Sequence, residues 1–146
     1  MSKVTKRFIF FFSIGILLIA VIVTYNIWNQ HHEDIQNAEA RSMTAVQLYK
    51  SLSEGSEEIK SILINQVINV SGEINQVIKN QKGQQVILLK TGTSGGSVNC
   101  TMEEEVMNIK EGDVVILKGV CIGYISGDPE IDLPGDVFLI RCYRSS

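Results

Sequence analysis

Three cysteines, Cys100, Cys121 and Cys142, are the residues of this 146-residue chain with the strongest potential for chemistry. They are too few for a disulfide scaffold and lack the C-x-x-C spacing typical of structural zinc sites. A catalytic thiolate needs an electropositive setting, often beside a histidine. Both histidines precede the segment that carries the cysteines. We therefore expect no enzyme, no metal site and no cofactor.

Two other clusters invite a metal or cation interpretation. His31 and His32 are sequence neighbours, so they would point to different sides of a helix, and we expect both to be solvated. Glu103, Glu104 and Glu105 open the segment 103–113, which has the pattern of a short helix closed by Lys110 and Gly112. Carboxylates in the first turn complement the helix dipole, and this explanation is favoured over cation binding.

The N-terminal thirty residues predict a membrane anchor. Phe8 to Tyr25 is a run of 18 residues without a charge, about 27 Å of helix against a bilayer core of roughly 30 Å. Tyr25 and Trp28 follow where amphipathic rings favour the interface. We expect a basic N-terminus at 1–7 and a transmembrane anchor at 8–28.

The basic residues Lys3, Lys6 and Arg7 all precede this run, so the positive-inside rule puts the N-terminus in the cytoplasm and the rest of the chain outside it. A cleaved signal peptide is the alternative. The bulky, polar residues that follow the run lack a small-residue cleavage pattern, which favours a retained, single-pass signal-anchor.

A polar stalk is expected at 29–42, and a helix plus a β domain at 43–146. Ala45, Leu48 and Leu52 have helical spacing, with Ser42 or Thr44 as candidate caps. This amphipathic helix is expected to pack onto its own domain. Gly55 ends it, and Ser56 to Glu58 reads as the start of a second short turn.

From Ile64 the hydrophobic period changes to two, which predicts strands. The first strand carries Gly72 near its middle, which suggests a bend that serves two parts of a sheet. The expected strands are 64–80, 84–91, 97–102, 113–126 and 136–144, with the helix 103–113 between the third and fourth. This β-β-β-α-β-β order is typical of a mainly β, five-stranded OB-type barrel.

Strand alternation predicts where the last cysteines point. In 113–126 the residues Val115, Leu117 and Cys121 share the face opposite Lys118, so Cys121 points inward. In 136–144 the same reasoning places Phe138, Ile140 and Cys142 inward. Closing the hairpin puts Cys121 opposite Cys142 to within one residue, which is within disulfide range. Outside the cytoplasm a Cys121–Cys142 disulfide with a free Cys100 is one expectation. Three reduced core cysteines are the other.

Short motifs resemble a known family. "AVQLYKSL" at 45–52, "V-x-G-x-I" at 70–74, "VNC" at 98–100, "LKGVCIG" at 117–123 and "LIRC" at 139–142 are similar to a family of bacterial membrane-anchored or exported proteins labelled tRNA-anti-like. The resemblance covers about Ala45 to Cys142. It implies an OB fold similar to the anticodon-binding domains of tRNA synthetases, and it implies no activity.

The charge balance bears on partners. From His31 onward there are 10 lysines and arginines against 16 acidic residues, a net charge of about −6. Because phosphate backbones attract clustered basic residues, nucleic acid is disfavoured as a partner. We expect an extracytoplasmic binding module on the bacterial cytoplasmic membrane, with a protein, a glycan or a small ligand as partner. Nucleic-acid binding through the OB face is the alternative.

Few residues stand out as a ligand face. The loops Thr91–Ser97 and Gly127–Gly135 are where an OB fold usually varies and binds. The candidate contact residues are Lys90, Lys118, Tyr124 and Tyr143.

Overall fold

The structure, a computed structural model, describes residues 15, 16, 18–25 and 35–145. It divides into two units, Met1–Asp34 and Ile35–Ser146. In the first unit residues 15, 16 and 18–25 are helical. Within the described ranges, no helix has the length and apolar character needed to cross a membrane. The segment 1–7 and much of the predicted anchor 8–28 lie outside the described residues.

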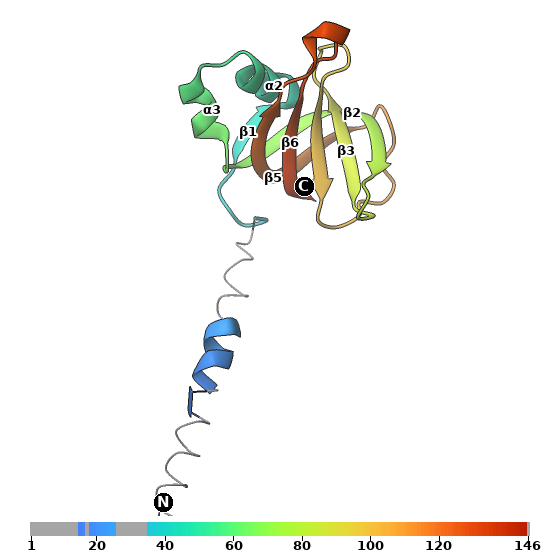
Figure 1. The fold of residues 1–146 in the computed structure, drawn as a ribbon. Coiled ribbons are helices and arrows are strands. Elements are labelled where there is room, and N and C mark those ends of the chain that lie inside the picture. Colours follow the sequence, from blue (N-terminus) through green and yellow to red (C-terminus); the bar gives the residue numbers. More distant parts are fainter. Residues whose placement is uncertain (1–14, 17, 26–34, 146) are drawn as a thin grey trace, which may run out of the picture. The chain divides into compact units, whose positions relative to one another are not determined.

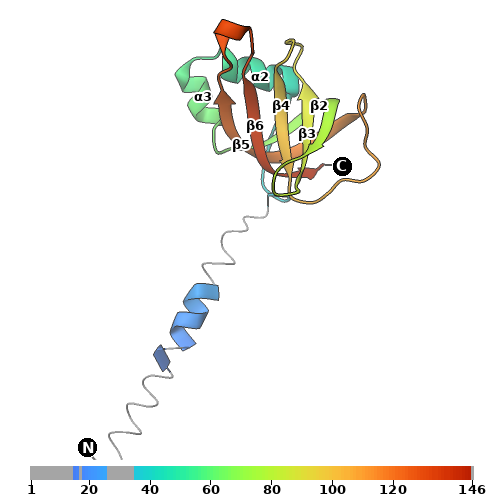
Figure 2. The same cartoon turned by 45° about the vertical axis from the view of Figure 1, so that its right-hand side comes forward.

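The second unit is a closed β-barrel (Figures 1 and 2). Its strands run in the order β2-β3-β4-β6-β5, and β5 pairs with β2 to close the ring. Because β4 and β6 are parallel and the other ring pairs are antiparallel, the barrel is mixed. This confirms the mainly β, five-stranded OB-like fold. The strand bounds are β2 Val67–Lys79, β3 Gln85–Lys90, β4 Ser97–Met102, β5 Val114–Ile125 and β6 Asp136–Arg144.

Strand β2 bends and serves two neighbours, as its central glycine predicts. Val67–Glu73 pairs with β5, whereas Ile74–Lys79 pairs with β3 across a register shift. A Cβ on Gly72 would lie 3.0 Å from the Ala45 Cβ, so the glycine also lets the helix that begins at Ala45 approach the strand. The register shift reverses the alternation, which is why Ile78 is exposed although Ile74 is fully buried.

Helix α2 spans Ala45–Ser53 and packs onto the barrel, as expected. Thr44 caps it: the Thr44 Oγ1 accepts a hydrogen bond from the Gln47 backbone N, and the Gln47 side chain accepts one from the Thr44 backbone N. The face toward the barrel consists of Ala45, Leu48, Tyr49 and Leu52.

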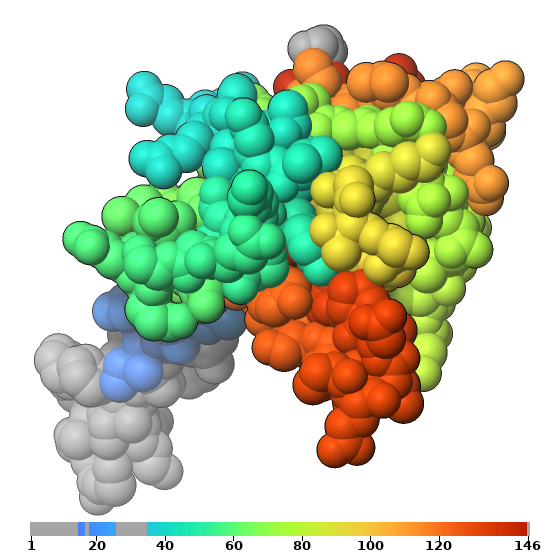
Figure 3. All heavy atoms as spheres, turned by 90° about the horizontal axis from the view of Figure 1, so that it is seen from above, coloured from blue at the N-terminus to red at the C-terminus, as the bar shows by residue number. Residues whose placement is uncertain are grey.

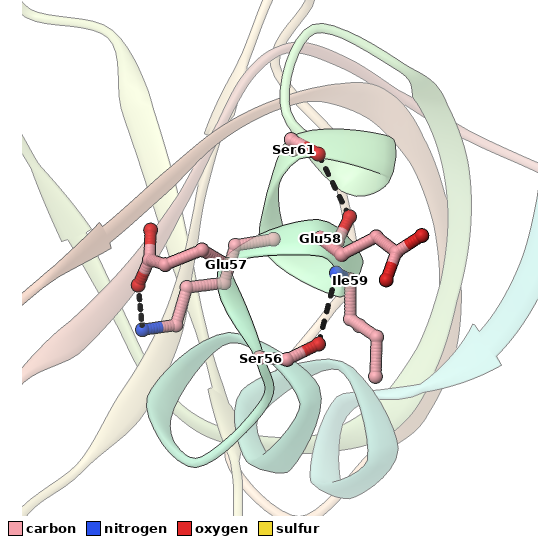
Figure 4. A network of polar contacts seen from close by, with 6 residues as sticks. Ser56, Glu57, Glu58, Ile59 and Ser61 are labelled. Atoms are coloured by element: carbon pink, nitrogen blue, oxygen red, sulfur yellow. Dashed lines mark hydrogen bonds and ion pairs between the residues drawn. The ribbon is translucent and has the colours of Figure 1, made fainter.

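Helix α3, Glu57–Leu63, is the predicted second turn (Figure 4). The Ser56 Oγ accepts a hydrogen bond from the Ile59 backbone N at 3.4 Å. The Lys60 Nζ lies 2.9 Å from the Glu57 carboxylate, and the Ser61 Oγ donates to the Glu58 carbonyl. These contacts are local and exposed, so Leu63, which is buried, is the residue that holds the helix on the domain.

The helix predicted at 103–113 is absent, and this part of the chain is a loop. Several of its backbone groups bond to the strands, although the Asp113 N also donates to the Lys110 O within the segment. The Gln85 side chain accepts from the Val106 N at 2.8 Å and donates to the Val106 O at 3.1 Å. The Gly112 N donates to the Ile74 O, and the Ile74 N donates to the Asp113 O. Tertiary hydrogen bonds therefore override the local helical pattern.

Part of the predicted stalk 29–42 belongs to the folded unit. Ile35 is 2% exposed, and the short strand β1, Arg41–Thr44, pairs in parallel with β2. The Lys118 Nζ donates to the Gln36 and Ala38 carbonyls. Residues 29–34 lie outside the described residues.

Strand β6 differs from its predicted facing. Val137 and Leu139 are fully buried, whereas Phe138 is half-buried and Ile140 is exposed. Arg141 adopts a positive φ of 52°, and the registers with β4 and β5 both shift near it. This irregularity reverses the inward and outward alternation of the side chains after Ile140. Cys142 therefore points inward as predicted, although Phe138 and Ile140 do not.

Candidate functional site

The three cysteines are free and fully buried. Cys121 pairs across the hairpin with Leu139, and Cys142 pairs with Met102 on β4. The prediction that Cys121 faces Cys142 is therefore wrong in register. The hairpin closes with Ile125 opposite Asp136, and unbroken pairing from there would put Ile140 opposite Cys121. The register shift between Cys121 and Gly123 changes that partner to Leu139, three residues from Cys142. The Cys142 thiol instead contacts the Cys100 thiol.

The surroundings of Cys100 and Cys121 raise the pKa of both thiols and keep them protonated. Burial raises the pKa of Cys121 to about 11, against a smaller lowering by the Gly123 backbone N–H. A hydrogen bond with Cys142, together with burial, raises the pKa of Cys100 well above its ordinary value. The reactive form of cysteine is the thiolate, so this setting favours packing over nucleophilic chemistry. Among the described residues no cluster of three His, Cys, Asp or Glu side chains is placed to hold a metal.

The structure separates the four candidate contact residues into two places. Lys118 and Tyr143 are cross-strand partners and line a hollow of about 370 Å³ near Gln36, Glu104 and Ser145. The Lys118 ammonium is already bonded to the Gln36 and Ala38 carbonyls. It fastens the start of the folded unit to the barrel, which leaves it poorly suited to meet a ligand.

Lys90 and Tyr124 lie at the other end of the strands. Lys90 comes directly before the loop Thr91–Ser97, and Tyr124 lies near the end of β5. This loop joins β3 to β4, and the loop Ser126–Gly135, which joins β5 to β6 and contains the 3₁₀ turn Pro129–Ile131, emerges at the same end (Figures 1 and 2). Seen from that end, the first loop lies beside both helix α2 and the second loop (Figure 3). We call these two loops together the loop end.

Two hollows adjoin the loop end and share Thr93 and Ser94. The first has a volume of about 580 Å³ and is lined by Tyr124 and the Ser126–Gly135 loop. The second has a volume of about 560 Å³ and is lined by Lys90, the Thr91–Ser97 loop and two amides of β2, Asn75 and Gln76. Both volumes are in the range of small-molecule sites in proteins.

Tyr49 of α2 holds the two loops in place. Its hydroxyl donates to the Gly135 carbonyl at 3.0 Å. Its ring meets the Tyr124 ring edge to face, with centroids 5.8 Å apart. A Cβ on Gly96 would lie 2.5 Å from the Tyr49 hydroxyl, so the first loop needs a glycine there. Burial, followed by the hydrogen-bonding contact with Tyr124, raises the pKa of Tyr49 to about 12.

Further hydrogen bonds join the loops at their bases. The Ser97 backbone N and Oγ both donate to the Asp136 carboxylate at 2.8 Å. The Thr91 Oγ1 donates to the Gly96 carbonyl and closes the first loop on itself. These bonds hold the loops to each other and to the barrel, and a site with few conformations has a lower entropic cost of binding.

The loop end carries little uncompensated positive charge. Lys90 forms an ion pair with Glu73, and Asp128, Glu130 and Asp132 lie on the second loop. The remaining lining consists of hydroxyl and amide side chains, glycine backbone, one aromatic ring and the apolar side chains of Leu88, Pro129, Leu133 and Pro134. Sequence analysis identified both loops, Lys90 and Tyr124 but missed Tyr49. The available signal was a tyrosine on the apolar face of a helix, because a buried phenol needs a hydrogen-bond partner.

The chain is similar in part to two solved structures. The first is the crystal structure of a protein assigned as an aspartyl-tRNA synthetase from Leishmania major Friedlin, with 9% sequence identity and a TM-score of 0.38. The match covers 73% of this chain and 21% of that one. The chain thus spans about a fifth of that protein. The OBody AM3L09, solved bound to hen egg-white lysozyme, has 16% identity and a TM-score of 0.38, covering 60% and 88%.

A search of curated proteins finds no significant match. The sequence itself matches the tRNA_anti-like family over residues 1–131, which includes the N-terminal segment, helix α2 and the barrel as far as the second loop. The match extends to the first residue, beyond the Ala45 at which the resemblance of short motifs begins. An OB-fold domain of this kind is a binding module, and the chain belongs to the tRNA_anti-like family.

Proposed function

We propose that this protein is a membrane-anchored, extracytoplasmic OB-fold module that binds its ligand at the loop end. The observation that carries the proposal is the pair of hollows around Thr93 and Ser94, held open by Tyr49 and by the Ser97–Asp136 bonds. Their walls are fixed by hydrogen bonds to the barrel and to α2. This is what a binding surface on a rigid scaffold requires.

The proposed membrane topology rests on the first residues of the chain. Lys3, Lys6 and Arg7 precede the uncharged run Phe8–Tyr25, which has the length and composition of a single span with the N-terminus inside. With this orientation the barrel belongs on the outer face of a bacterial cytoplasmic membrane.

Nucleic-acid binding is the weaker candidate. Single-stranded nucleic acid is bound by grooves that combine positive charge with stacking aromatic rings. At the loop end the Lys90 charge is offset by Glu73, and the second loop is acidic. Lys79, further along β2, is also paired, with Glu105 at 3.1 Å. Salt-sensitive, micromolar binding of a single-stranded RNA in a mobility-shift assay would overturn this argument.

Thiol labelling tests the address and the exposure of the loop end together. Spheroplasts carrying Ser94→Cys or Ser2→Cys are treated with a membrane-impermeant maleimide before and after lysis. We expect Ser94→Cys to label in intact spheroplasts and Ser2→Cys only after lysis. The unmodified chain is the control, since its three buried thiols should not label. Labelling of Ser2→Cys but not Ser94→Cys before lysis would refute the proposal.

A further inference from the structure

The chemistry of the loop end narrows the class of ligand. Around the second hollow the hydrogen-bonding side chains include the amides of Asn75 and Gln76 and the hydroxyls of Thr93 and Ser94. Leu88 and Lys90 also line it. Each amide offers both donors and acceptors, and each hydroxyl offers both as well. A surface of this kind suits a ligand that is itself rich in hydroxyl and amide groups.

The charges disfavour strongly ionic ligands. A polyanion would meet Asp132 and the Lys90–Glu73 pair without an uncompensated cation in the lining of either hollow. A polycation would find Asp132 in the first hollow but no carboxylate in the lining of the second. An uncharged ligand long enough to contact both hollows leaves the Lys90–Glu73 pair intact, and the exposed Asp132 carboxylate keeps its contact with solvent.

Tyr124 supplies the aromatic ring of the first hollow, whose apolar lining also includes Pro129, Leu133 and Pro134. It lines the first hollow, and Tyr49 and Gly135 hold its ring, since a Cβ on Gly135 would lie 2.6 Å from the Tyr124 hydroxyl. A fixed aromatic ring offers its face to the C–H groups of a sugar ring, while Asp132 and Ser126 of the same hollow offer acceptors to sugar hydroxyls.

We propose that the loop end binds an uncharged oligosaccharide, with one part of the chain against Tyr124 and the next against Asn75 and Gln76, passing over Thr93 and Ser94. This inference rests on the proposed function and names the ligand class for the same site. The ligand carries no charge, and apart from the Asp132 carboxylate the bond-forming groups of the site are neutral hydroxyls and amides, so binding should depend weakly on salt.

The test uses the full-length chain in detergent micelles and three probes: chitotetraose, cellotetraose and maltotetraose. Calorimetry should detect at least one of them, with an affinity that changes less than about twofold between low and physiological salt. Ser94→Trp places a large ring between the hollows and should weaken binding at least about tenfold. Asn75→Ala removes one hydrogen-bonding side chain and should weaken it about three- to tenfold.

Ser145→Trp is the matched control because Ser145 lines the separate hollow beside Lys118. It should leave the affinity unchanged within about twofold, and urea unfolding should show that all three variants fold. Absence of binding by every tetrasaccharide at about 5 mM would overturn the inference. So would a loss of binding in Ser145→Trp but not in Ser94→Trp.

Binding measurements with oligolysine and with a single-stranded RNA distinguish failure of the oligosaccharide assignment from failure of the proposed function. If either binds and Ser94→Trp abolishes that binding, the loop end is a binding site but the oligosaccharide assignment is wrong. If no ligand binds there and Ser94→Cys is also shielded in spheroplasts, the proposed function itself fails.

Discussion

The rings of Tyr49 and Tyr124 meet edge to face, with centroids 5.8 Å apart and planes at 86°. Tyr49 comes from the helix before the barrel, and Tyr124 is the second-last residue of β5. This contact therefore joins the N-terminal part of the folded unit to the loop end. The Tyr49 hydroxyl continues the connection to Gly135. Helix α2 therefore acts as a structural support of the site.

Replacing Tyr49 tests this support. Tyr49→Phe keeps the ring contact but leaves the Gly135 carbonyl without its donor, and we expect a loss of about 1 kcal/mol in the free energy of unfolding. Tyr49→Ala also removes the buried ring and should cost about 3–5 kcal/mol. Urea unfolding measures both. Equal stability of wild type and Tyr49→Ala would contradict the role given to this residue.

Gly119 tests the packing of the cysteine cluster. A Cβ at this position would lie 2.4 Å from the Cys142 Sγ and 3.1 Å from the Ile140 carbonyl. Gly119→Ala should therefore destabilise the domain by about 1–3 kcal/mol.

A second substitution isolates the sulfur contact. In Gly119→Ala with Cys142→Ala the closest clash is removed, so the two changes should be less costly together than the sum of the single effects. Strictly additive costs would show that the strain at Gly119 has another origin.

Alkaline pH should weaken the fold. The pKa of Tyr49 is raised to about 12 and that of Cys121 to about 11, both by burial above all. Each neutral form is therefore favoured in the folded state, and the unfolded chain loses these protons first as pH rises. The stability they contribute is complete below about pH 8 and declines from there, being lost as pH rises through the folded-state values.

Urea unfolding at about pH 8 and about pH 10.5 measures this decline. Tyr49→Phe and Cys121→Ala each remove one titrating group, so the fall in stability between the two pH values should be smaller in each variant than in wild type. If stability falls as much in both variants as it does in wild type, these groups are not the cause of the decline.

The thiols give a test of the corrected strand register. We expect the native protein isolated from membranes to contain no Cys121–Cys142 disulfide, because Cys121 lies opposite Leu139 and Cys142 lies against Cys100. Digestion without reduction and mass spectrometry report the bond directly. A cross-linked peptide joining Cys121 and Cys142 would contradict the register.

Sequence reasoning succeeded where local pattern and tertiary structure agree. The bend of β2 at Gly72, the inward cysteines and the Thr44 cap follow from alternation, from a central glycine and from a threonine before an apolar helical period. Sequence reasoning failed where an irregularity in a strand changes the alternation of inward and outward side chains. Nothing in the composition of β6 indicates the positive φ of Arg141, and that single conformation reversed the predicted facing of Phe138 and Ile140.

The candidate site shows the same division. Both loops could be predicted because glycine, serine and proline interrupt the strand pattern there. The segment 103–113 could not, because the Gln85 side chain that holds the Val106 backbone comes from a strand 21 residues away. Tyr49 lies 86 residues from Gly135, and no local pattern reports such a contact.

Hydrogen–deuterium exchange on the full-length protein, with and without the tightest-binding tetrasaccharide, tests the central claim most directly. The account predicts added protection in peptides covering Thr91–Ser97 and Ser126–Gly135 and none in peptides covering Gln36–Asn37 or Tyr143–Ser145. Protection confined to the second pair, or protection at neither end, would contradict a binding site at the loop end.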